Sequence, residues 1–556
     1  MSVSHAILDE FARAGVDVLF GIPGGAIGPL FDAVVDRPSI RTIIAKHETQ
    51  AVFMAMGYSR ATGRPALVAT TAGPGFTNVM TGLASAALDA LPIIVVAGEV
   101  ATTTFGRGTV QEGSAHSIDM VGIARRLSKF AAQVAVPASG PSIARRAVAT
   151  ALSGKMGPAF ISLPIDVACT RIAPTRLTGA VQSRFDVSLE VCQEVAQALN
   201  GARRPMILVG NGARSLEARN AVLALAEKRS APVIATTKAK GIIPEDHPLF
   251  LGIFGLGGHA SVMAELEKRR PDVLLVCGSS LNDIGTNAWS PMLAPTALHI
   301  HLDIDTLQIG RNYHTDLGVV GPLETVLPRV TEFVSARAAE GPWTPLSSQP
   351  ALPVAPGRPG TLSAQQTIAV LNRVCGERTI FTCDFGEYLS AVVGRLRVRR
   401  QGDFLLALGL GSMGSSLGTA IGYRLGAPGA RVVALCGDGA MLMFGNEIAT
   451  AAYHRIPVTF CAMNDGRLNM VHQGQTAIYG RSLPLEHGPV DLAMLATALG
   501  AKGVHAHTEA ELAQALMEPV DGPLVIDIAT DPDVVVEKSQ RFAALKHFAG
   551  DPNATL

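Results

Sequence analysis

The 556-residue chain is too long for one hydrophobic core, because single cores stop growing at roughly 250–300 residues. Lys and Arg total 46, as do Asp and Glu, so we expect neither a nucleic acid nor a membrane surface as a partner. No apolar run reaches the roughly 18–20 residues that span a bilayer, and the first residues lack a signal-peptide pattern. We therefore expect a cytoplasmic protein.

Short apolar runs alternate with Ala-rich stretches along the chain, beginning with 66–70 and 93–97 and ending with 458–463 and 524–528. Continuous apolar strands between helices are typical of buried parallel sheets, so the pattern predicts the α/β class. Polar residues at about 172–190 and a Pro-, Ser- and Gly-rich stretch at 343–361 interrupt this alternation. We predict three doubly wound parallel-sheet domains at 1–175, 188–335 and 363–535, a linker at 336–362 and a C-terminal tail at 536–556.

Polar residues follow two apolar runs of the third domain. Gly437-Asp438-Gly439 comes directly after 432–436, and Asn464 comes directly after 458–463. The interval accommodates one crossover helix, which places both side chains at the carboxyl edge of a parallel sheet. A lone Asp-Gly is an ordinary turn, but this order favours a Mg²⁺ site in which Asp438, Asn464 and the Gly466 carbonyl supply oxygen ligands beside a diphosphate.

The sequence Gly437-Asp438-Gly439-Ala440, followed by Asn464-Asp465, resembles the diphosphate-binding motif of thiamine-diphosphate enzymes. Residues 409–414 are similar to the preceding segment of acetolactate synthases. The resemblance implies that the Gly411 carbonyl receives the 4′-amino group of the cofactor and that Met413 enforces its V shape, although Met413 alone would be interpreted as a core methionine. It further implies cofactor contacts at Gly386, Glu387, Tyr388, Leu468, Asn469 and Met470.

In the first domain, Glu48 stands between a strand predicted around 41–44 and an Ala- and Met-rich helix predicted at 49–61. A glutamate there is usually a helix-start residue favoured by the helix dipole. However, residues 21–26 and 72–78 resemble acetolactate synthase in the same order. The resemblance implies that Glu48 bonds N1′ of the cofactor as a general acid worth roughly 10²–10⁴-fold. Implied neighbours are the catalytic positions Gly25 and Gln111 and the cofactor-binding positions Pro23, Gly73 and Asn78.

The same resemblance carries an expectation about assembly. In this family the pyrimidine and diphosphate ends of the site meet across a subunit interface. We therefore expect a homodimer or homotetramer with active sites at the interface and a small 2-oxo acid as substrate.

Several positions depart from the family. Val110 stands where the loop at 109–112 would carry Phe, and an insertion within 113–118 contains His116, a surface or pocket residue. Gly474 replaces a pocket tryptophan, which opens space for a bulkier substrate. Glu387 and Tyr388 replace a Gln-His pair. The predicted substrate pocket comprises Gly25, Val110, Gln111, His116, Met413, His472 and Gln473.

The middle domain resembles the flavin-binding domain of acetohydroxyacid synthase at 209–212, 252–255 and 301–305. Residues 280–284 lack both arginines of that family, which disfavours FAD and indicates a vestigial domain. The Gly210-Asn211-Gly212 turn alone does not establish a dinucleotide site.

The sequence thus predicts a thiamine-diphosphate- and Mg²⁺-dependent carboligase that decarboxylates a 2-oxo acid, with pyruvate as the expected donor. Three alternatives stay open. The first is a decarboxylase that releases an aldehyde, and the second is a flavin- or nicotinamide-dependent oxidoreductase using residues 210–212. The third is a silent cofactor-binding protein, which the intact Glu48, Asp438 and Asn464 disfavour.

Overall fold

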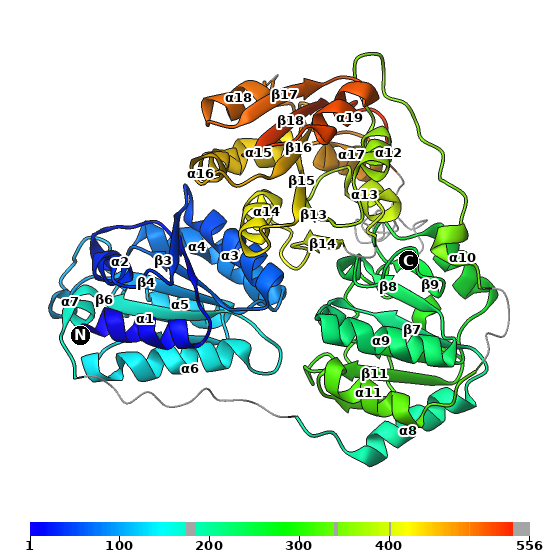
Figure 1. Ribbon diagram of the computed structural model, residues 1–556, viewed down its shortest axis with the longest axis horizontal. Coiled ribbons are helices and arrows are strands. Elements are labelled where there is room, and N and C mark those ends of the chain that lie inside the picture. The colour runs from blue at the N-terminus through cyan, green and yellow to red at the C-terminus, as the bar shows by residue number, and fades with distance from the viewer. Residues whose placement is uncertain (174–184, 338–342, 400–401, 489, 537–556) are drawn as a thin grey trace.

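Three α/β units make up the protein (Figure 1). The computed structural model describes residues 1–173, 185–337, 343–399, 402–488 and 490–536. Each unit contains a six-stranded sheet whose neighbouring strands pair in parallel. The predicted fold class is confirmed, whereas the exact boundaries stay predictions. Residues 338–342 of the predicted linker and 537–556 of the predicted tail lie outside the described residues. None of the described helices has the length and apolar character of a membrane span.

The first unit has the strand order β2-β1-β3-β4-β6-β5. Its strands are β1 (Val18–Gly21), β2 (Arg41–Ile44), β3 (Ala66–Thr70), β4 (Ile93–Glu99), β5 (Phe130–Gln133) and β6 (Ala159–Pro164). Its helices are α1 (Val3–Arg13), α2 (Gly28–Val35), α3 (Glu48–Thr62), α4 (Pro74–Leu88), α5 (Met120–Leu127), α6 (Gly140–Leu152) and α7 (Ile165–Cys169). The strand order reverses between β1 and β3, where α/β sheets open a crevice at their carboxyl ends.

The third unit repeats this order as β14-β13-β15-β16-β18-β17. Its strands are β13 (Thr379–Cys383), β14 (Asp403–Leu406), β15 (Arg431–Gly437), β16 (Thr459–Asn464), β17 (Lys502–Ala506) and β18 (Leu524–Ala529). Its helices are α12 (Ala364–Val374), α13 (Leu389–Arg395), α14 (Ser415–Gly426), α15 (Asp438–Phe444), α16 (Ile448–Tyr453), α17 (Asn469–Tyr479), α18 (Leu492–Ala498) and α19 (Glu509–Met517). Here the reversal lies between β13 and β15.

The central unit has the order β12-β11-β10-β7-β8-β9, which is the Rossmann arrangement. It contains β7 (Pro205–Val209), β8 (Val233–Thr236), β9 (Phe250–Phe254), β10 (Val273–Cys277), β11 (Leu298–Asp303) and β12 (Leu317–Val320), with α8 (Leu189–Gly201), α9 (Leu216–Arg229), α10 (Ala260–Lys268) and α11 (Leu323–Phe333). At the reversal, a Cβ on Gly210 would lie 2.2 Å from the Gly278 carbonyl oxygen. The backbone of Gly278 therefore fills the space beside this glycine turn, so the structure does not support a dinucleotide site there.

Helices α3 and α14 join the first and third units by close backbone contact (Figure 1). A Cβ on Gly57 would lie 2.0 Å from the Thr419 carbonyl oxygen, and one on Gly422 would lie 1.8 Å from that of Met54. Larger side chains at either glycine would push the helices apart. The close packing of α3 against α14 therefore fixes the position of Glu48, at the start of α3, relative to the third unit.

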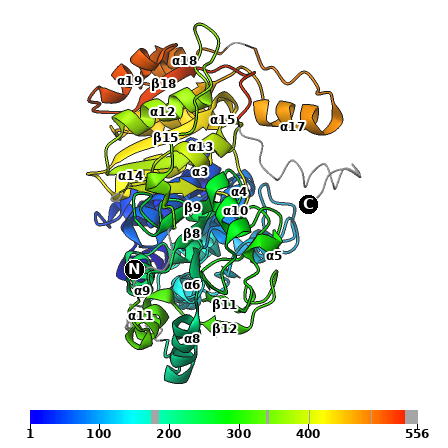
Figure 2. The ribbon, with the colours of Figure 1, turned by 90° about the vertical axis from the view of Figure 1, so that its right-hand side faces the viewer.

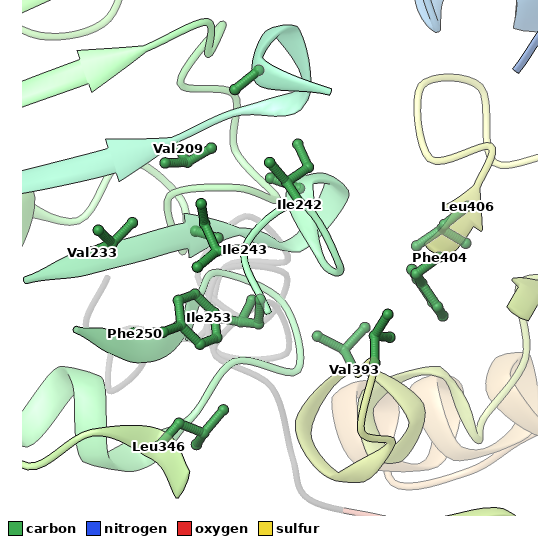
Figure 3. Close-up of a cluster of buried hydrophobic side chains, with 14 of the residues drawn as sticks. Val209, Val233, Ile242, Ile243, Phe250, Ile253, Leu346, Val393, Phe404 and Leu406 are labelled. Carbon is green, nitrogen blue, oxygen red and sulfur yellow. The ribbon is translucent and has the colours of Figure 1, made fainter. Parts of the chain in front are cut away.

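A buried lysine joins the central and third units. The Lys240 ammonium pairs with Glu245 and donates to the carbonyls of Val393 at 3.0 Å and Leu396 at 2.7 Å. Figure 3 shows the surrounding apolar side chains, with Val393 and Phe404 of the third unit facing Ile242 of the central one.

Lys240→Met should lower the free energy of unfolding by about 3 kcal/mol, because the buried Glu245 carboxylate would keep only its longer ion pair with Arg397 and two buried carbonyls would lose their donor. Chemical denaturation measures this change. The double variant Lys240→Met/Glu245→Leu should recover much of the loss. A single variant as stable as the parent would show that the junction does not depend on this pair.

Candidate active site

Glu48 begins α3, with three residues between it and the end of β2, and its side chain is 8% exposed. The Asn78 side chain donates from Nδ2 to the Glu48 Oε2 at 2.9 Å. Asn78 lies in the first turns of α4, which follows β3. The carboxyl ends of two strands of one sheet thus bring the predicted acid and its predicted neighbour together.

Gly25 and Gly73 follow the two strands that flank the reversal of the first sheet. No atom lies within 4 Å of the position of a Cβ on Gly25, so open space adjoins it. Gly73 has a left-handed backbone with φ +61°, and a Cβ there would lie 2.8 Å from the Gln111 Cγ. The structure therefore places Gln111 against the predicted cofactor segment, while Pro23 lies beside Gly25 in the segment after β1.

The loop between β4 and α5 carries the other predicted pocket residues of the first unit. The buried Glu99 carboxylate accepts the Gly113 amide at 3.0 Å and so holds the base of the loop. Val110 is 84% exposed. The His116 ring packs near Gly106 of the same loop, 3.5 Å from the position of a Cβ there. The pocket roles of Val110 and His116 stay predictions.

Asp438 begins α15 directly after β15 and is almost fully buried. Its Oδ2 accepts the amides of Asp465 at 3.0 Å and Gly466 at 2.7 Å, so the ends of β15 and β16 meet at this carboxylate. Gly466 has φ +77°, and its carbonyl oxygen accepts the His487 amide at 3.1 Å, which leaves a second lone pair. Two of the three predicted metal ligands are therefore neighbours.

Asn464, the third predicted metal ligand, ends β16. Its Nδ2 donates to the Val490 carbonyl at 2.9 Å and to the Asp527 Oδ1 at 3.0 Å. Both amide hydrogens are engaged, so Oδ1 is the atom left for a further partner. The Asp527 Oδ2 also accepts the Leu492 amide at 2.9 Å. Sequence reasoning missed Asp527, although a carboxylate inside the apolar strand β18 was a signal.

Met413 and Leu468 close over Gly439. A Cβ on Gly439 would lie 2.9 Å from the Met413 Cε and 3.0 Å from a Leu468 Cδ, so the second glycine of the turn admits no side chain. Gly411, two residues before Met413, packs against Phe385, which follows β13. The predicted residues of this segment therefore gather at the reversal between β13 and β15.

Asp384 fixes the segment that contains Gly411 and Met413. Its carboxylate accepts the amides of Gly414 at 2.8 Å and Ser416 at 3.2 Å, together with the hydroxyls of Ser415 and Ser416. Burial raises the pKa of Asp384 to about 6, while these hydrogen bonds oppose the rise. Asp384 therefore ties the end of β13 to the start of α14, a role that its sequence position did not reveal.

Glu387 and Tyr388 lie at the same end of β13. The buried Tyr388 ring lies 2.3 Å from the position of a Cβ on Gly386 and 3.6 Å from one on Gly437. Burial, together with the charge of Asp465, raises the pKa of Glu387 to about 7, while Arg467 lowers it. This pKa gives a physical basis for tolerating a carboxyl group here, because the protonated form carries no charge that would repel a phosphate.

Helix α17 carries the last predicted residues and projects from the body of the protein (Figure 2). The side chains of Asn469 and Gln473 donate to the Pro532 carbonyl at 3.0 and 3.3 Å. Met470 is half-buried, and the buried His472 Nδ1 has no hydrogen-bond partner in the part of the chain that the structure describes. The structure thus directs Asn469 and Gln473 towards the segment after β18, and their predicted ligand contacts stay predictions.

Residues around Glu48 contact the third unit of the same chain. The Glu447 carboxylate, which sequence reasoning did not single out, accepts the Lys46 amide at 3.1 Å. The Gln50 Nε2 donates to the Gly414 carbonyl at 2.8 Å, and the His47 ring packs edge-on against Phe444. Glu48 and the segment that contains Met413 are therefore linked within one chain through α3.

Three sequence models of one family match the chain. The N-terminal TPP-binding domain of thiamine pyrophosphate enzymes matches residues 1–119, the central domain matches 192–330 and the C-terminal TPP-binding domain matches 384–528. The chain belongs to the thiamine pyrophosphate enzymes. Thiamine pyrophosphate is another name for thiamine diphosphate, so the family anticipated from Glu48, Asp438 and Asn464 is confirmed.

Within this family, relatives at about 30% identity include acetolactate synthases. The large subunit from Mycobacterium tuberculosis (strain CDC 1551 / Oshkosh) is 31% identical in an alignment that covers 96% of this chain and 88% of the relative. A probable large subunit from Methanocaldococcus jannaschii is 32% identical, with 96% and 92% covered. The large subunit of isozyme 1 from Escherichia coli K12 is 30% identical, with 94% and 93% covered. The chain is therefore an acetolactate synthase-like thiamine pyrophosphate enzyme.

The fold has a close match among solved structures. A thiamine diphosphate-dependent 4-hydroxybenzoylformate decarboxylase from Rhodococcus jostii RHA1 superposes with a TM-score of 0.84 at 24% identity, covering 96% of this chain and 99% of that one. This match establishes the shared three-unit architecture.

The residues at the end of β15 fit the diphosphate of this cofactor. A Cβ on Gly439 would collide with Met413 and Leu468, whereas no described atom beyond the chain neighbours lies within 4 Å of the position of a Cβ on Gly466, so open space adjoins this predicted metal ligand. Among the described residues the buried Tyr388 hydroxyl has no hydrogen-bond partner, and both hydrogen bonds of the Asn464 amide are donated by its Nδ2, so its Oδ1 can serve as a ligand. These groups, with Asp438 and the Gly466 carbonyl, form a donor and oxygen-ligand set suited to a magnesium diphosphate.

Proposed function

We propose that this thiamine-diphosphate enzyme uses Mg²⁺, decarboxylates a 2-oxo acid and joins the remaining fragment to a second carbonyl compound, with pyruvate as the donor. The main support for the proposal is that the first and third sheets each present, at one edge, polar side chains suited to one end of the cofactor. One edge presents Glu48 held by Asn78, and the other presents Asp438 beside the Asn464–Gly466 segment. When bound, the cofactor supplies the electron sink for decarboxylation. The acetolactate synthase relatives support the choice of reaction.

In this proposal, Glu48 acts on the pyrimidine of the cofactor, and the residues around Asp438 bind its metal ion. Glu48 holds a proton at N1′ of the pyrimidine, and Asn78 keeps its carboxylate in place. Asp438, the Asn464 Oδ1 and the Gly466 carbonyl would hold the metal ion. Because Asp527 fixes the Asn464 amide, the metal ligand is oriented before the ion arrives.

We propose further that two chains assemble so that Glu48 of one chain and Asp438 of the other form one site. Exposed apolar side chains near the site support a second copy, because such surface is usually covered in an assembly. Val110 in the loop after β4 is 84% exposed. Leu442 and Met443 of α15 are exposed as well.

Mixing two inactive variants tests this arrangement. A chain with Glu48→Gln and a chain with Asp438→Ala, refolded or co-expressed together, should form a mixed dimer in which one site has both native residues. We expect activity far above that of either variant alone. Sites built within a single chain would each keep one defect, so an inactive mixture, with mixed dimers demonstrated by differential tags, would contradict the shared site.

The products formed from pyruvate test the reaction. With thiamine diphosphate and Mg²⁺ we expect acetolactate or another ketol, detected by chromatography against standards. Acetaldehyde alone would instead support the decarboxylase alternative.

An absorbance spectrum of the purified protein tests the oxidoreductase alternative, which requires a bound flavin or nicotinamide. Assaying a panel of 2-oxo acids and aldehydes identifies the acceptor, for which Gly474 leaves room.

A further inference from the structure

Gln111, a predicted catalytic residue, has a backbone conformation that few side chains adopt. Its φ is +66°, which lies in the left-handed region. A residue other than glycine is strained there and keeps the conformation only where its surroundings enforce it. The loop at 100–119, between β4 and α5, should therefore contain groups that hold Gln111 in place.

The side chain of Gln111 lies against the segment that leads to Glu48. A Cβ on Gly73 would lie 2.8 Å from the Gln111 Cγ and 3.0 Å from its Cβ. Gly73 immediately precedes α4, the helix whose Asn78 donates to the Glu48 carboxylate. A shift of the loop would therefore move Gln111 relative to the predicted acid.

Glu112, the residue after Gln111, closes the loop on itself. Its Oε1 accepts the Gly106 amide at 2.7 Å and the Ser114 hydroxyl at 2.5 Å. Its own amide donates to the Thr109 carbonyl at 3.1 Å. The bonds from Gly106 and Ser114 lower the pKa of Glu112, so the side chain binds as a charged acceptor. Hydrogen bonds to charged groups are the strong ones, so Glu112 joins the two sides of the turn firmly.

Glu99, the last residue of β4, attaches the same loop to the sheet. Its Oε1 accepts the amides of Val100 at 2.8 Å and Gly113 at 3.0 Å. A Cβ on Gly113 would lie 2.5 Å from the Met120 Cε, so the backbone at this point also packs against the start of α5. The chain is thus held within two residues of Gln111 by a contact to the sheet and a contact to a helix.

The second oxygen of Glu99 shows how two acidic side chains can anchor one loop. Glu99 is fully buried, and its Oε2 has no hydrogen-bond partner among the described residues. Burial, together with the charge of Glu112, raises the pKa of Glu99, while its two amide bonds oppose the rise. This favours the neutral acid and so limits the repulsion between the two side chains. Asp166 of α7, at the same edge of the sheet, accepts the Thr102 amide at 3.1 Å.

We propose that Glu99 and Glu112 are positioning residues that hold Gln111 against the segment at Gly73 and affect the reaction through Gln111. The inference rests on the proposed function and deepens it. Both glutamates bind groups of the loop itself, so they act on the site through the conformation of the loop. Gly113 and Ser114 belong to the stretch at 113–118 that contains the predicted insertion, which thereby gains a role in anchoring Gln111.

A double-mutant cycle on kcat/KM for pyruvate tests the proposal. Glu112→Ala should lower kcat/KM by roughly 10- to 100-fold, because misplacing a catalytic group by about 1 Å can cost about 10²-fold. Gln111→Ala sets the limit of this loss, and the double variant Glu112→Ala/Gln111→Ala should lose no more than Gln111→Ala alone. Glu99→Ala should resemble Glu112→Ala, whereas Glu99→Gln keeps an oxygen for the two amides and should recover most of the loss. Glu267→Gln, at an exposed position of α10, should follow the parent.

Hydrogen exchange of the ligand-free protein, measured by mass spectrometry, gives a readout that needs no turnover. The amides of Gly106 and Gly113 donate to the two glutamates. Peptides that cover the loop should therefore exchange roughly tenfold faster in Glu112→Ala and Glu99→Ala, the effect of losing one hydrogen bond. Calorimetric affinity for thiamine diphosphate with Mg²⁺ should stay close to that of the parent, because neither variant changes a predicted cofactor contact.

Two outcomes would overturn the proposal. One is parent-like exchange of the loop in both alanine variants. The other is a double variant whose loss equals the sum of the losses of Glu112→Ala and Gln111→Ala, because Glu112 would then act independently of Gln111. If Glu112→Ala does not fold, Glu112→Gln, which keeps one acceptor oxygen without the charge, replaces it in the cycle. Failure of the parent to convert pyruvate would instead refute the proposed function, while the exchange measurement would still decide whether the glutamates hold the loop.

Discussion

Glu48→Gln should lower turnover by roughly 10²–10⁴-fold while leaving binding of thiamine diphosphate nearly unchanged. The glutamine oxygen can still accept the Asn78 Nδ2 hydrogen, so the side chain should keep its position. What it loses is the ability to hold and exchange a proton at the pyrimidine. Because the side chain is 8% exposed, water should not replace the missing acid. Steady-state kinetics with pyruvate and calorimetric binding of the cofactor measure the two effects.

Two further variants sharpen this result. Asn78→Ala removes the hydrogen bond to Glu48 but keeps the acid, so its loss of turnover should be smaller. Glu217→Gln changes an exposed glutamate of α9 in the central unit and should leave turnover unchanged. Parent-like turnover in Glu48→Gln would remove the central step of the proposed mechanism, whereas loss of cofactor binding would show that Glu48 acts mainly as a binding residue.

The sequence predicted the site best where polar residues follow apolar runs. Asp438 and Asn464 stand at the ends of β15 and β16, and Glu48 begins the helix that follows β2. In a parallel sheet the ends of neighbouring strands share one edge, so order along the chain translates into proximity in space. Unbroken apolar strands also made the three sheets predictable, because buried parallel strands leave little room for polar side chains.

The residues that support the site were harder to predict because their contacts join distant parts of the chain. Asp527 acts on Asn464 from another strand, and Asp384 acts on the start of α14. His487 reaches Asp438 through a segment that pairs with residues 466–468. A buried carboxylate in an apolar strand was a usable signal for Asp527, whereas His487 lies in a polar stretch without periodicity.

The repeated strand order clarifies why the two ends of the site look unrelated in sequence. The first and third sheets share the same order and reverse at equivalent points, yet one edge presents a carboxylate with an amide donor and the other presents a glycine turn with oxygen ligands. Equivalent backbone crevices can therefore serve opposite ends of one cofactor. The fold supplies the position, and the residues that follow each strand supply the chemistry.

Asp438→Ala should abolish Mg²⁺-dependent retention of thiamine diphosphate. Loss of groups that merely orient a metal ligand costs roughly 10–100-fold in metal affinity, so loss of a ligand should cost at least as much. The substitution also leaves the amides of Asp465 and Gly466 without their acceptor, which should loosen the loop that carries the Gly466 carbonyl. Cofactor remaining after desalting in the presence of Mg²⁺ measures retention directly.

Asp438→Asn separates the charge from the geometry. Its amide oxygen can still accept one of the two backbone hydrogens, so the loop should stay closer to its native position while the negative charge opposite the metal ion is lost. We expect the dependence of cofactor binding on Mg²⁺ concentration to shift to higher concentration in Asp438→Asn and to disappear in Asp438→Ala. Asp521→Asn, at an exposed position before β18, should follow the parent. Equal retention in all three variants would mean that the metal binds elsewhere, because a carboxylate with two backbone partners would then serve only to close the turn.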